Sequence, residues 1–171
     1  MFVPTRVPPH KEAVDDPGPE VRLALCEAAV GRDERFGVSR IELDRPGPSY
    51  TVDTLRSIHA TSPGDELTFI VGGDMAASLP QWREPEALLD LAMLGVAERA
   101  EIRRDEILRA LGGLRGAAER VRFFSMPRLD VSSTDIRDRV RAGRPIRYLV
   151  PDDVARLIGA RGLYRTEVHI P

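Results

Sequence analysis

The sequence has few of the residues that mark secreted, metal-binding or membrane proteins. Its 171 residues include one cysteine, Cys26, which excludes an internal disulfide and favours a reducing cytoplasm. The histidines His10, His59 and His169 are scattered and do not have the ligand spacing of a zinc site. No apolar run approaches the roughly 20 residues that span a bilayer, and early prolines argue against a signal peptide. We therefore expect neither a membrane partner nor a bound structural metal.

An excess of charge of one sign is also lacking. The 25 basic and 27 acidic side chains give a net charge of −2, so no general attraction to nucleic acid is expected. Lys11 is the only lysine. The arginines at 139, 141, 144 and 147 could form a basic rim, but Asp135 and Asp138 lie next to this series and a solvated face is the simpler expectation. Any phosphate ligand must therefore be held by local groups.

Apolar periodicity predicts strands alternating with helices, which is typical of an α/β protein with a parallel sheet. With no internal repeat or linker, one domain over residues 1–171 is expected. Strands are predicted over residues 1–4 (the end of a strand), 36–43, 67–71, 93–97 and 121–125. Helices are predicted over residues 20–30, 51–60 (capped by Ser49 or Thr51), 75–79, 84–91, 101–111, 133–142 and 152–160.

Polar and glycine-rich segments follow several of the predicted strands. Ligands of parallel α/β sheets bind at the carboxyl ends of the strands, so these segments are expected at one rim. A pocket there would be aromatic on one side and would accept anions on the other. The segments are His10-Lys11, Pro48-Ser49-Tyr50-Thr51, Gly72-Gly73-Asp74 and Ser132-Ser133-Thr134.

The stretch from Val131 to Arg137 has the composition of an anion site. Ser132 or Ser133 can cap a helix, and the free N–H groups of a helix start attract phosphate. Arg137, one turn further on, adds a planar donor suited to phosphate oxygens. The alternative is an ordinary capped helix with a solvated arginine.

Six motifs, in order, cover nearly the whole chain and together are specific. They closely resemble the bacterial nicotinate-nucleotide adenylyltransferases, of the nucleotidyltransferase superfamily. The motifs are Pro8-Pro9-His10-Lys11, Arg40-Ile41-Glu42-Leu43, Pro48-Ser49-Tyr50-Thr51-Val52-Asp53-Thr54-Leu55, Gly73-Asp74 followed by Trp82, Ser132-Ser133-Thr134-Asp135-Ile136-Arg137, and Tyr148-Leu149-Val150-Pro151.

The resemblance implies a Rossmann-like, doubly wound parallel sheet and transfer of AMP from ATP to nicotinate mononucleotide, giving deamido-NAD and pyrophosphate. It implies that Trp82 stacks on the nicotinate ring and that the N–H groups of Tyr50 and Thr51 bind its carboxylate. It assigns Gly73, Asp74 and Lys11 to substrate binding. It assigns the ATP phosphates to Ser132, Ser133, Thr134 and Arg137, and Mg²⁺ to the phosphates themselves.

Each of these residues also has a purely structural alternative. Trp82 can be a half-buried core residue, and Thr51 and Asp74 can complement helix starts. Lys11 can be a solvated surface lysine. Cys26, at helical spacing with Leu23 and Val30, is expected to fill the core.

One part of the family pattern is absent from the sequence given. The family opens with a central strand and a His-x-x-His motif facing the ATP phosphates, and no such motif occurs here. We therefore expect an N-terminally shortened domain without the family's catalytic histidines, through a start codon assigned too far downstream or a shortened clone. A naturally shortened protein is a third alternative, and it is physically less favourable. Loss of a central strand would leave unpaired edges in the sheet.

Three functions remain open from the sequence. The first is the nicotinate mononucleotide adenylyltransferase, with a homodimer as one open assembly. The second is a catalytically impaired module that binds pyridine nucleotide without turning over ATP. The third is a sister enzyme using nicotinamide mononucleotide; Ser49-Tyr50-Thr51 and Trp82 argue against phosphopantetheine as the substrate.

Overall fold

A computed structural model describes residues 1–8, 16–98, 103–127 and 129–165. The chain forms two compact units, one made of Met1–Ser49 with Asp130–Pro171 and the other of Tyr50–Leu129. We call these unit 1 and unit 2. The single domain expected over residues 1–171 stays a prediction. No helix in the described part of the chain is both long and apolar enough to cross a membrane.

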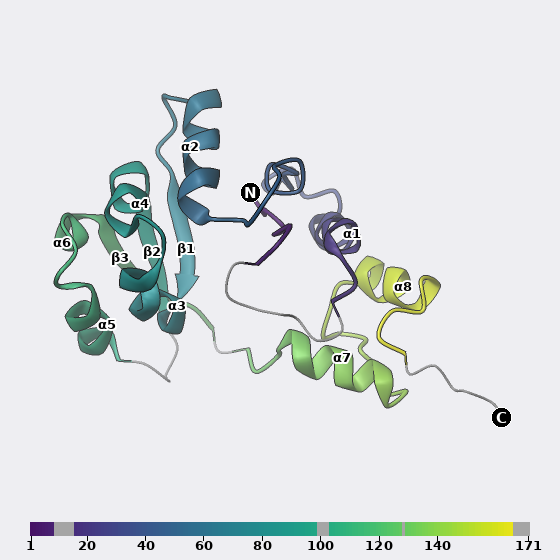
Figure 1. The fold of residues 1–171 in the computed structure, drawn as a ribbon. Helices are drawn as coiled ribbons and strands as arrows, with labels where there is room; N and C mark the ends of the chain where they lie inside the picture. The colour runs from purple at the N-terminus through teal and green to yellow at the C-terminus, as the bar shows by residue number, and fades with distance from the viewer. Residues whose placement is uncertain (9–15, 99–102, 128, 166–171) are drawn as a thin grey trace. The chain divides into compact units, whose positions relative to one another are not determined.

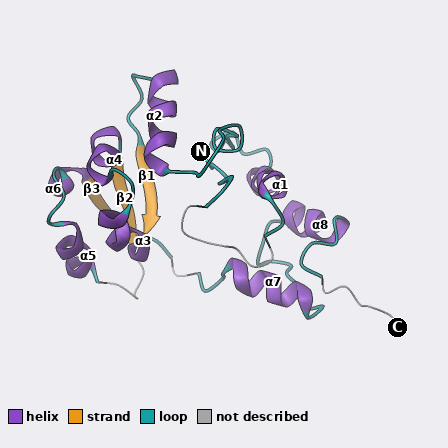
Figure 2. Cartoon of the chain, in the orientation of Figure 1, coloured by secondary structure: helices purple, strands orange, loops and turns teal. Residues whose placement is uncertain are grey.

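Unit 2 contains a parallel sheet of three strands in the order β1-β2-β3 (Figure 2). The strands are β1 (Thr68–Gly72), β2 (Met93–Glu98) and β3 (Val121–Ser125). The register pairs Ile70 with Gly95 and Gly95 with Arg122. This parallel pairing confirms the predicted parallel sheet. The sequence specifies it through three apolar runs of strand length that are separated by helical segments.

Helices connect the strands of unit 2, and α2 precedes the first of them (Figure 1). The pairs α2–α4 and α3–α5 pack together. The helices are α2 (Thr51–Thr61), α3 (Gly73–Ser78), the 3₁₀ turn η1 (Leu79–Gln81), α4 (Pro85–Leu91), α5 (Arg104–Leu111) and α6 (Ala117–Arg120). The short helix α6 was not predicted, and α5 begins three residues later than predicted.

A buried apolar cluster holds unit 2 together. Leu88, Leu89, Leu94 and Val96 have no exposed surface, and Leu79 has 1%. Burial of each such side chain contributes roughly 1.5–3 kcal/mol. The strand β2 therefore lies in the core, and the residues that follow β1 are anchored to it.

Over the described residues of unit 1, the regular elements are helices joined by loops and turns. The unit contains α1 (Pro19–Val30), α7 (Ser133–Arg141) and α8 (Asp152–Ala160). Ile136, Ile146, Val154 and Ile158 form its buried cluster. Cys26 is half-buried and is not part of this cluster, so its expected core-filling role stays a prediction; its partial burial raises the pKa of its thiol.

The predicted strands over residues 1–4 and 36–43 are wrong. They are reduced to one parallel bridge between Phe2 and Val38, where the Phe2 N–H donates to Gly37 and its carbonyl accepts from Ser39. Pro4 has no N–H to extend the ladder. A turn ends the second segment, because the N–H of Asp44 donates to the carbonyl of Arg40 at 3.0 Å.

We expect Leu94→Ala to destabilise unit 2 by about 3 kcal/mol, because it removes a fully buried side chain and leaves a cavity. Urea denaturation followed by circular dichroism measures the loss. Leu108→Ala, at a position that is 45% exposed, is the matched control and should change stability by less than about 1 kcal/mol. Equal losses in both variants would contradict the placement of this core.

Candidate substrate site

The start of α2 lies in unit 2 and has no side-chain cap. Its N-cap is Tyr50, whose carbonyl accepts the N–H groups of Asp53 and Thr54 at 3.1 and 3.2 Å. The first N–H groups of a helix have no partner inside it and carry the positive end of the dipole. This helix start can therefore bind an anionic group.

Neither predicted capping residue caps α2. The hydroxyl of Ser49 is buried and accepts the N–H groups of Arg6 and Val7, at 3.1 and 3.5 Å. Thr51 is already the first residue of the helix. The predicted cap at Ser49 or Thr51 is therefore wrong, and the predicted positions of Tyr50 and Thr51 at the helix start are confirmed.

Trp82 is half-buried and held in place on two sides. Its ring meets Phe69 edge to face, with centroids 6.0 Å apart and planes at 66°. Its indole N–H donates to the Ser78 hydroxyl at 3.0 Å. Trp82 packs against the buried cluster, so it has the half-buried core position that was the structural alternative to ligand stacking. The part that stays accessible can still face a ligand, so the stacking role stays a prediction.

Gly72, Gly73 and Asp74 lie at the carboxyl end of β1. A Cβ at Gly72 would lie 2.9 Å from Oδ1 of Asp74, so a larger residue there would require this exposed carboxylate to shift. Asp74 is exposed in the first turn of α3, where Gly72 is the N-cap, and it is not the cap that the alternative required. Asp74 can still accept a hydrogen bond from a ligand hydroxyl.

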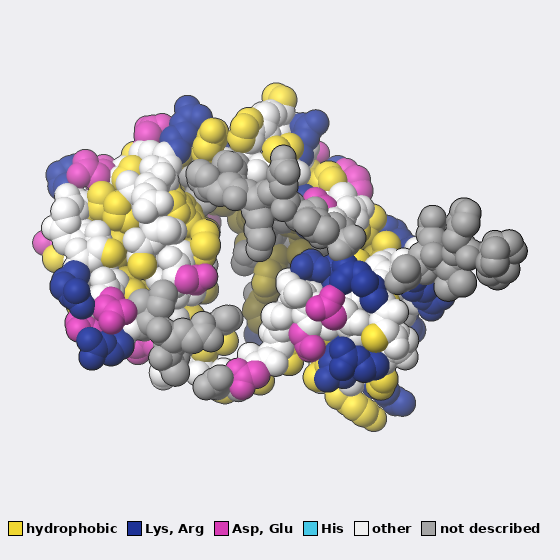
Figure 3. Space-filling model, turned by 60° about the horizontal axis from the view of Figure 1, so that its bottom comes forward, with side chains coloured by type: hydrophobic (Ala, Val, Ile, Leu, Met, Phe, Trp, Pro, Cys, Tyr) yellow, Lys and Arg dark blue, Asp and Glu magenta, His cyan; other side chains and the backbone are white. Residues whose placement is uncertain are grey.

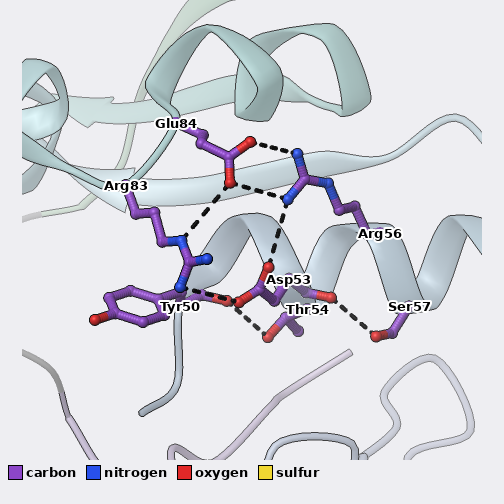
Figure 4. A network of polar contacts seen from close by, with 7 residues as sticks. All are labelled: Tyr50, Asp53, Thr54, Arg56, Ser57, Arg83 and Glu84. Atoms are coloured by element: carbon purple, nitrogen blue, oxygen red, sulfur yellow. Dashed lines mark hydrogen bonds and ion pairs between the residues drawn. The ribbon is translucent and has the colours of Figure 1, made fainter.

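Three residues absent from the sequence prediction surround the start of α2 (Figure 4). The guanidinium carbon of Arg83 lies 4.7 Å from the centroid of the Tyr50 ring. Arg56 binds both oxygens of Glu84, at 3.1 and 2.6 Å. This hydrogen bonding lowers the pKa of Glu84, which stays ionised. The sequence signal was the position of Arg83 and Glu84 directly after Trp82.

In unit 1, the cap of α7 is Ser132, one of the two predicted residues, and Ser133 is the first residue of the helix. The hydroxyl oxygen of Ser132 accepts the Asp135 N–H at 3.0 Å. The Arg137 side chain donates to the Thr134 hydroxyl at 3.3 Å. The capped-helix alternative is therefore confirmed for Ser132, and it leaves other N–H groups of the first turn for a ligand.

A cavity of about 310 Å³ lies beside the start of α7. Ser132, Ser133 and Arg137 line it together with apolar side chains, among them Leu25 and Val154. A volume of this order suits a small ligand with a polar end and an apolar body. Thr134 does not line it, although it contacts Arg137.

Basic residues near α7 and α8 do not form a patch of one charge. Arg139 pairs with Asp135 at 3.3 Å, and Arg141 and Arg156 each pair with an aspartate on their own helix. Figure 3 shows arginine and acidic side chains interspersed on the face it displays. The solvated face expected for residues 139–147 fits these pairs.

Two predictions about the site remain: the placement of Lys11 and the pocket expected to join all the predicted site residues. Lys11 lies outside the described residues. Tyr50, Thr51, Gly73, Asp74 and Trp82 belong to unit 2, whereas Ser132, Ser133, Thr134 and Arg137 belong to unit 1. The single pocket joining both sets stays a prediction. Across the described residues, no group of three or more His, Cys, Asp or Glu side chains is arranged to hold a metal ion.

The chain belongs to the cytidylyltransferase-like family, whose model matches residues 1–139. Proteins named as probable nicotinate-nucleotide adenylyltransferases are among its relatives. The one from Roseiflexus sp. is 44% identical, over 96% of this chain and 82% of that protein. The one from Mycobacterium avium is 41% identical, over 98% of this chain and 78% of that protein. The resemblance drawn from the six motifs is confirmed.

The fold agrees with a solved structure. Nicotinic acid mononucleotide adenylyltransferase of Plasmodium falciparum, in complex with NaAD, superposes with a TM-score of 0.70 at 17% identity. The match covers 95% of this chain and 80% of that chain. It confirms the predicted Rossmann-like α/β fold with a parallel sheet.

Asp16 forms an ion pair with Arg22 on the same unit as Arg137, and this predicts a pH dependence. The hydrogen bond from Arg22 lowers the pKa of Asp16, and the charge of Arg137 adds to this. A lowered folded pKa contributes stability that is present above the unfolded value of about 4 and is lost as pH falls through the folded value.

We expect Asp16→Asn to destabilise unit 1 by about 1 kcal/mol at pH 7, and the difference from the parent chain to shrink between about pH 5 and pH 3. Chemical denaturation across this range measures it. Asp65→Asn, at an exposed turn position, is the control and should show no such dependence. A difference that stays constant with pH would rule out the ion pair as the cause.

Proposed function

We propose that this chain transfers the AMP moiety of ATP to nicotinate mononucleotide, giving deamido-NAD and pyrophosphate in NAD biosynthesis. The observation that carries the proposal is the 37–44% identity to nicotinate-nucleotide adenylyltransferases over nearly all of this chain. The start of α2, which has no side-chain cap, supports it, because a helix start favours a carboxylate over a neutral amide.

The proposed mechanism relies on positioning and charge neutralisation. A phosphate oxygen of the mononucleotide attacks the α-phosphorus of ATP in line, the bond to the β-phosphate oxygen breaks, and pyrophosphate leaves. The N–H groups of Tyr50 and Thr51 bind the carboxylate, Trp82 stacks on the pyridine ring, and Gly73 and Asp74 bind the polar edge of the mononucleotide. No covalent enzyme intermediate is needed.

The ATP phosphates are assigned to Ser132, Ser133, Thr134 and Arg137, and Lys11 stays assigned to substrate binding. Hydroxyls, helix N–H groups and a guanidinium all donate hydrogen bonds to phosphate oxygens. Mg²⁺ is proposed to enter with ATP as part of the substrate, because it keeps several waters and needs few protein ligands. We place the reaction in the cytoplasm, because both substrates are compatible with that compartment and its reducing conditions suit the single free cysteine, Cys26.

A second candidate function is a module that binds the mononucleotide without transfer. Pyrophosphate release with ATP and each mononucleotide, measured beside equilibrium binding, separates the two. Release with nicotinate mononucleotide supports the transferase, binding without release supports the module, and neither result contradicts both.

We expect Trp82→Ala to raise KM for the mononucleotide about fivefold to tenfold, because it removes a stacking surface worth of order 1 kcal/mol. KM for ATP should change much less. Arg137→Ala is the matched variant and should raise KM for ATP instead. Steady-state pyrophosphate release measures both constants, and equal effects of Trp82→Ala on the two substrates would argue against stacking.

A further inference from the structure

We propose that the side chain of Arg83 determines the preference for the acid form of the mononucleotide, and that Glu84, held by Arg56, positions it. The inference rests on the proposed function and extends it to a residue that the motifs did not assign. All the groups involved belong to unit 2 and appear together in Figure 4.

Arg83 brings a positive charge to the uncapped start of α2. Its guanidinium lies over the ring of Tyr50, the N-cap residue, at 4.7 Å from the ring centroid. The helix start and the guanidinium both donate hydrogen bonds and both favour an anion. A carboxylate at this position gains from both, whereas a neutral amide gains little from either charge.

The partners of Arg83 leave hydrogen-bonding capacity for a ligand. Its nitrogens lie 3.9 Å from Asp53 and 3.6 Å from Glu84, beyond ordinary hydrogen-bond distance, and its side chain is 52% exposed. A ligand carboxylate at about 2.8 Å would exchange a long contact for a charge-assisted hydrogen bond. Arg83 can thus change partners without leaving a buried charge unpaired.

Arg56 does not have this freedom. It binds both oxygens of Glu84, at 3.1 and 2.6 Å, and lies 3.5 Å from Asp53. Because Arg56 belongs to α2 and Glu84 is the N-cap of α4, this ion pair links the two helices next to the Trp82-Arg83 segment.

The surroundings of Glu84, which include its ion pair with Arg56, hold its backbone in an uncommon conformation. Its φ of 50° lies in the left-handed region, which is uncommon for a residue with a side chain and persists where the surroundings impose it. Since Arg83 directly precedes it, the backbone of Glu84 helps to fix where Arg83 leaves the chain. Glu84 is therefore a positioning residue and does not need to touch the ligand.

The test is equilibrium binding of nicotinate and nicotinamide mononucleotides to the full chain. Trp82 is the only tryptophan, so its fluorescence reports binding without ATP turnover, and calorimetry repeats the measurement independently. The parent chain should bind the acid more tightly. Arg83→Gln should reduce the acid-to-amide affinity ratio about tenfold, because binding of the acid form becomes weaker. Arg83→Lys keeps the positive charge and should keep most of this ratio.

A double-mutant cycle tests the positioning role. Glu84→Gln should lower the acid-to-amide ratio in the parent chain and have no further effect in the Arg83→Gln variant, because it acts through Arg83. Arg115→Gln is the matched control, since Arg115 is an exposed arginine of the same unit that pairs with Asp90 at 3.1 Å. Its ratio should equal that of the parent chain, and thermal melting checks that every variant folds.

The outcomes separate the two proposals. A parent chain that prefers the acid while Arg83→Gln keeps the same preference overturns this inference and leaves the proposed function standing. Additive effects of Glu84→Gln and Arg83→Gln overturn the positioning role. A parent chain that binds neither mononucleotide, or binds both equally, overturns the inference and the acid-specific function together.

Discussion

Burial of β2 and of the helix α4 that precedes it is the constraint on which the geometry of unit 2 depends. Leu88 and Leu89 on α4 and Leu94 and Val96 on β2 are fully buried, so neither element can shift without opening a cavity. The segment Trp82-Arg83-Glu84 enters α4 directly. Packing of the core therefore fixes one end of the segment, and hydrogen bonding of Trp82 to Ser78 fixes its other side.

The starts of α2 and α7 differ in a way that matches two kinds of anion. α2 has no side-chain cap, and an aromatic ring with an arginine above it flanks its first residue. α7 is capped by Ser132, has hydroxyls in its first turn and has Arg137 one turn further on. A flat acid such as nicotinate suits the first environment, and the many oxygens of a triphosphate suit the second.

Local patterns were sufficient to predict the sheet and most helices. The runs at 67–71, 93–97 and 121–125 are short and apolar, and the apolar pattern stops at both ends of each run. All three runs form strands. Ser132 was recognisable as a cap because capping depends on residues three apart. The strand predicted at 36–43 failed because alternation alone does not supply a pairing partner, and in the described residues that pairing is limited to one bridge.

The polar network of unit 2 could not be predicted, because its partners are distant in the sequence. Arg56 and Glu84 are separated by 28 residues, and no periodicity relates them. The same holds for the hydroxyl of Ser49, which is bound by the N–H of Arg6 across 43 residues and so does not cap α2. Side-chain chemistry indicated the candidate residues, whereas only the fold shows which of them meet.

The most direct test of the account is a nuclear magnetic resonance titration of the ¹⁵N-labelled chain with nicotinate mononucleotide, and separately with a non-hydrolysable ATP analogue. The account predicts that the mononucleotide shifts the amide signals of Tyr50 and Thr51 and the indole signal of Trp82. The ATP analogue should shift the amides of Ser133 and Thr134. A mononucleotide that leaves Thr51 and Trp82 unchanged at saturation would contradict it.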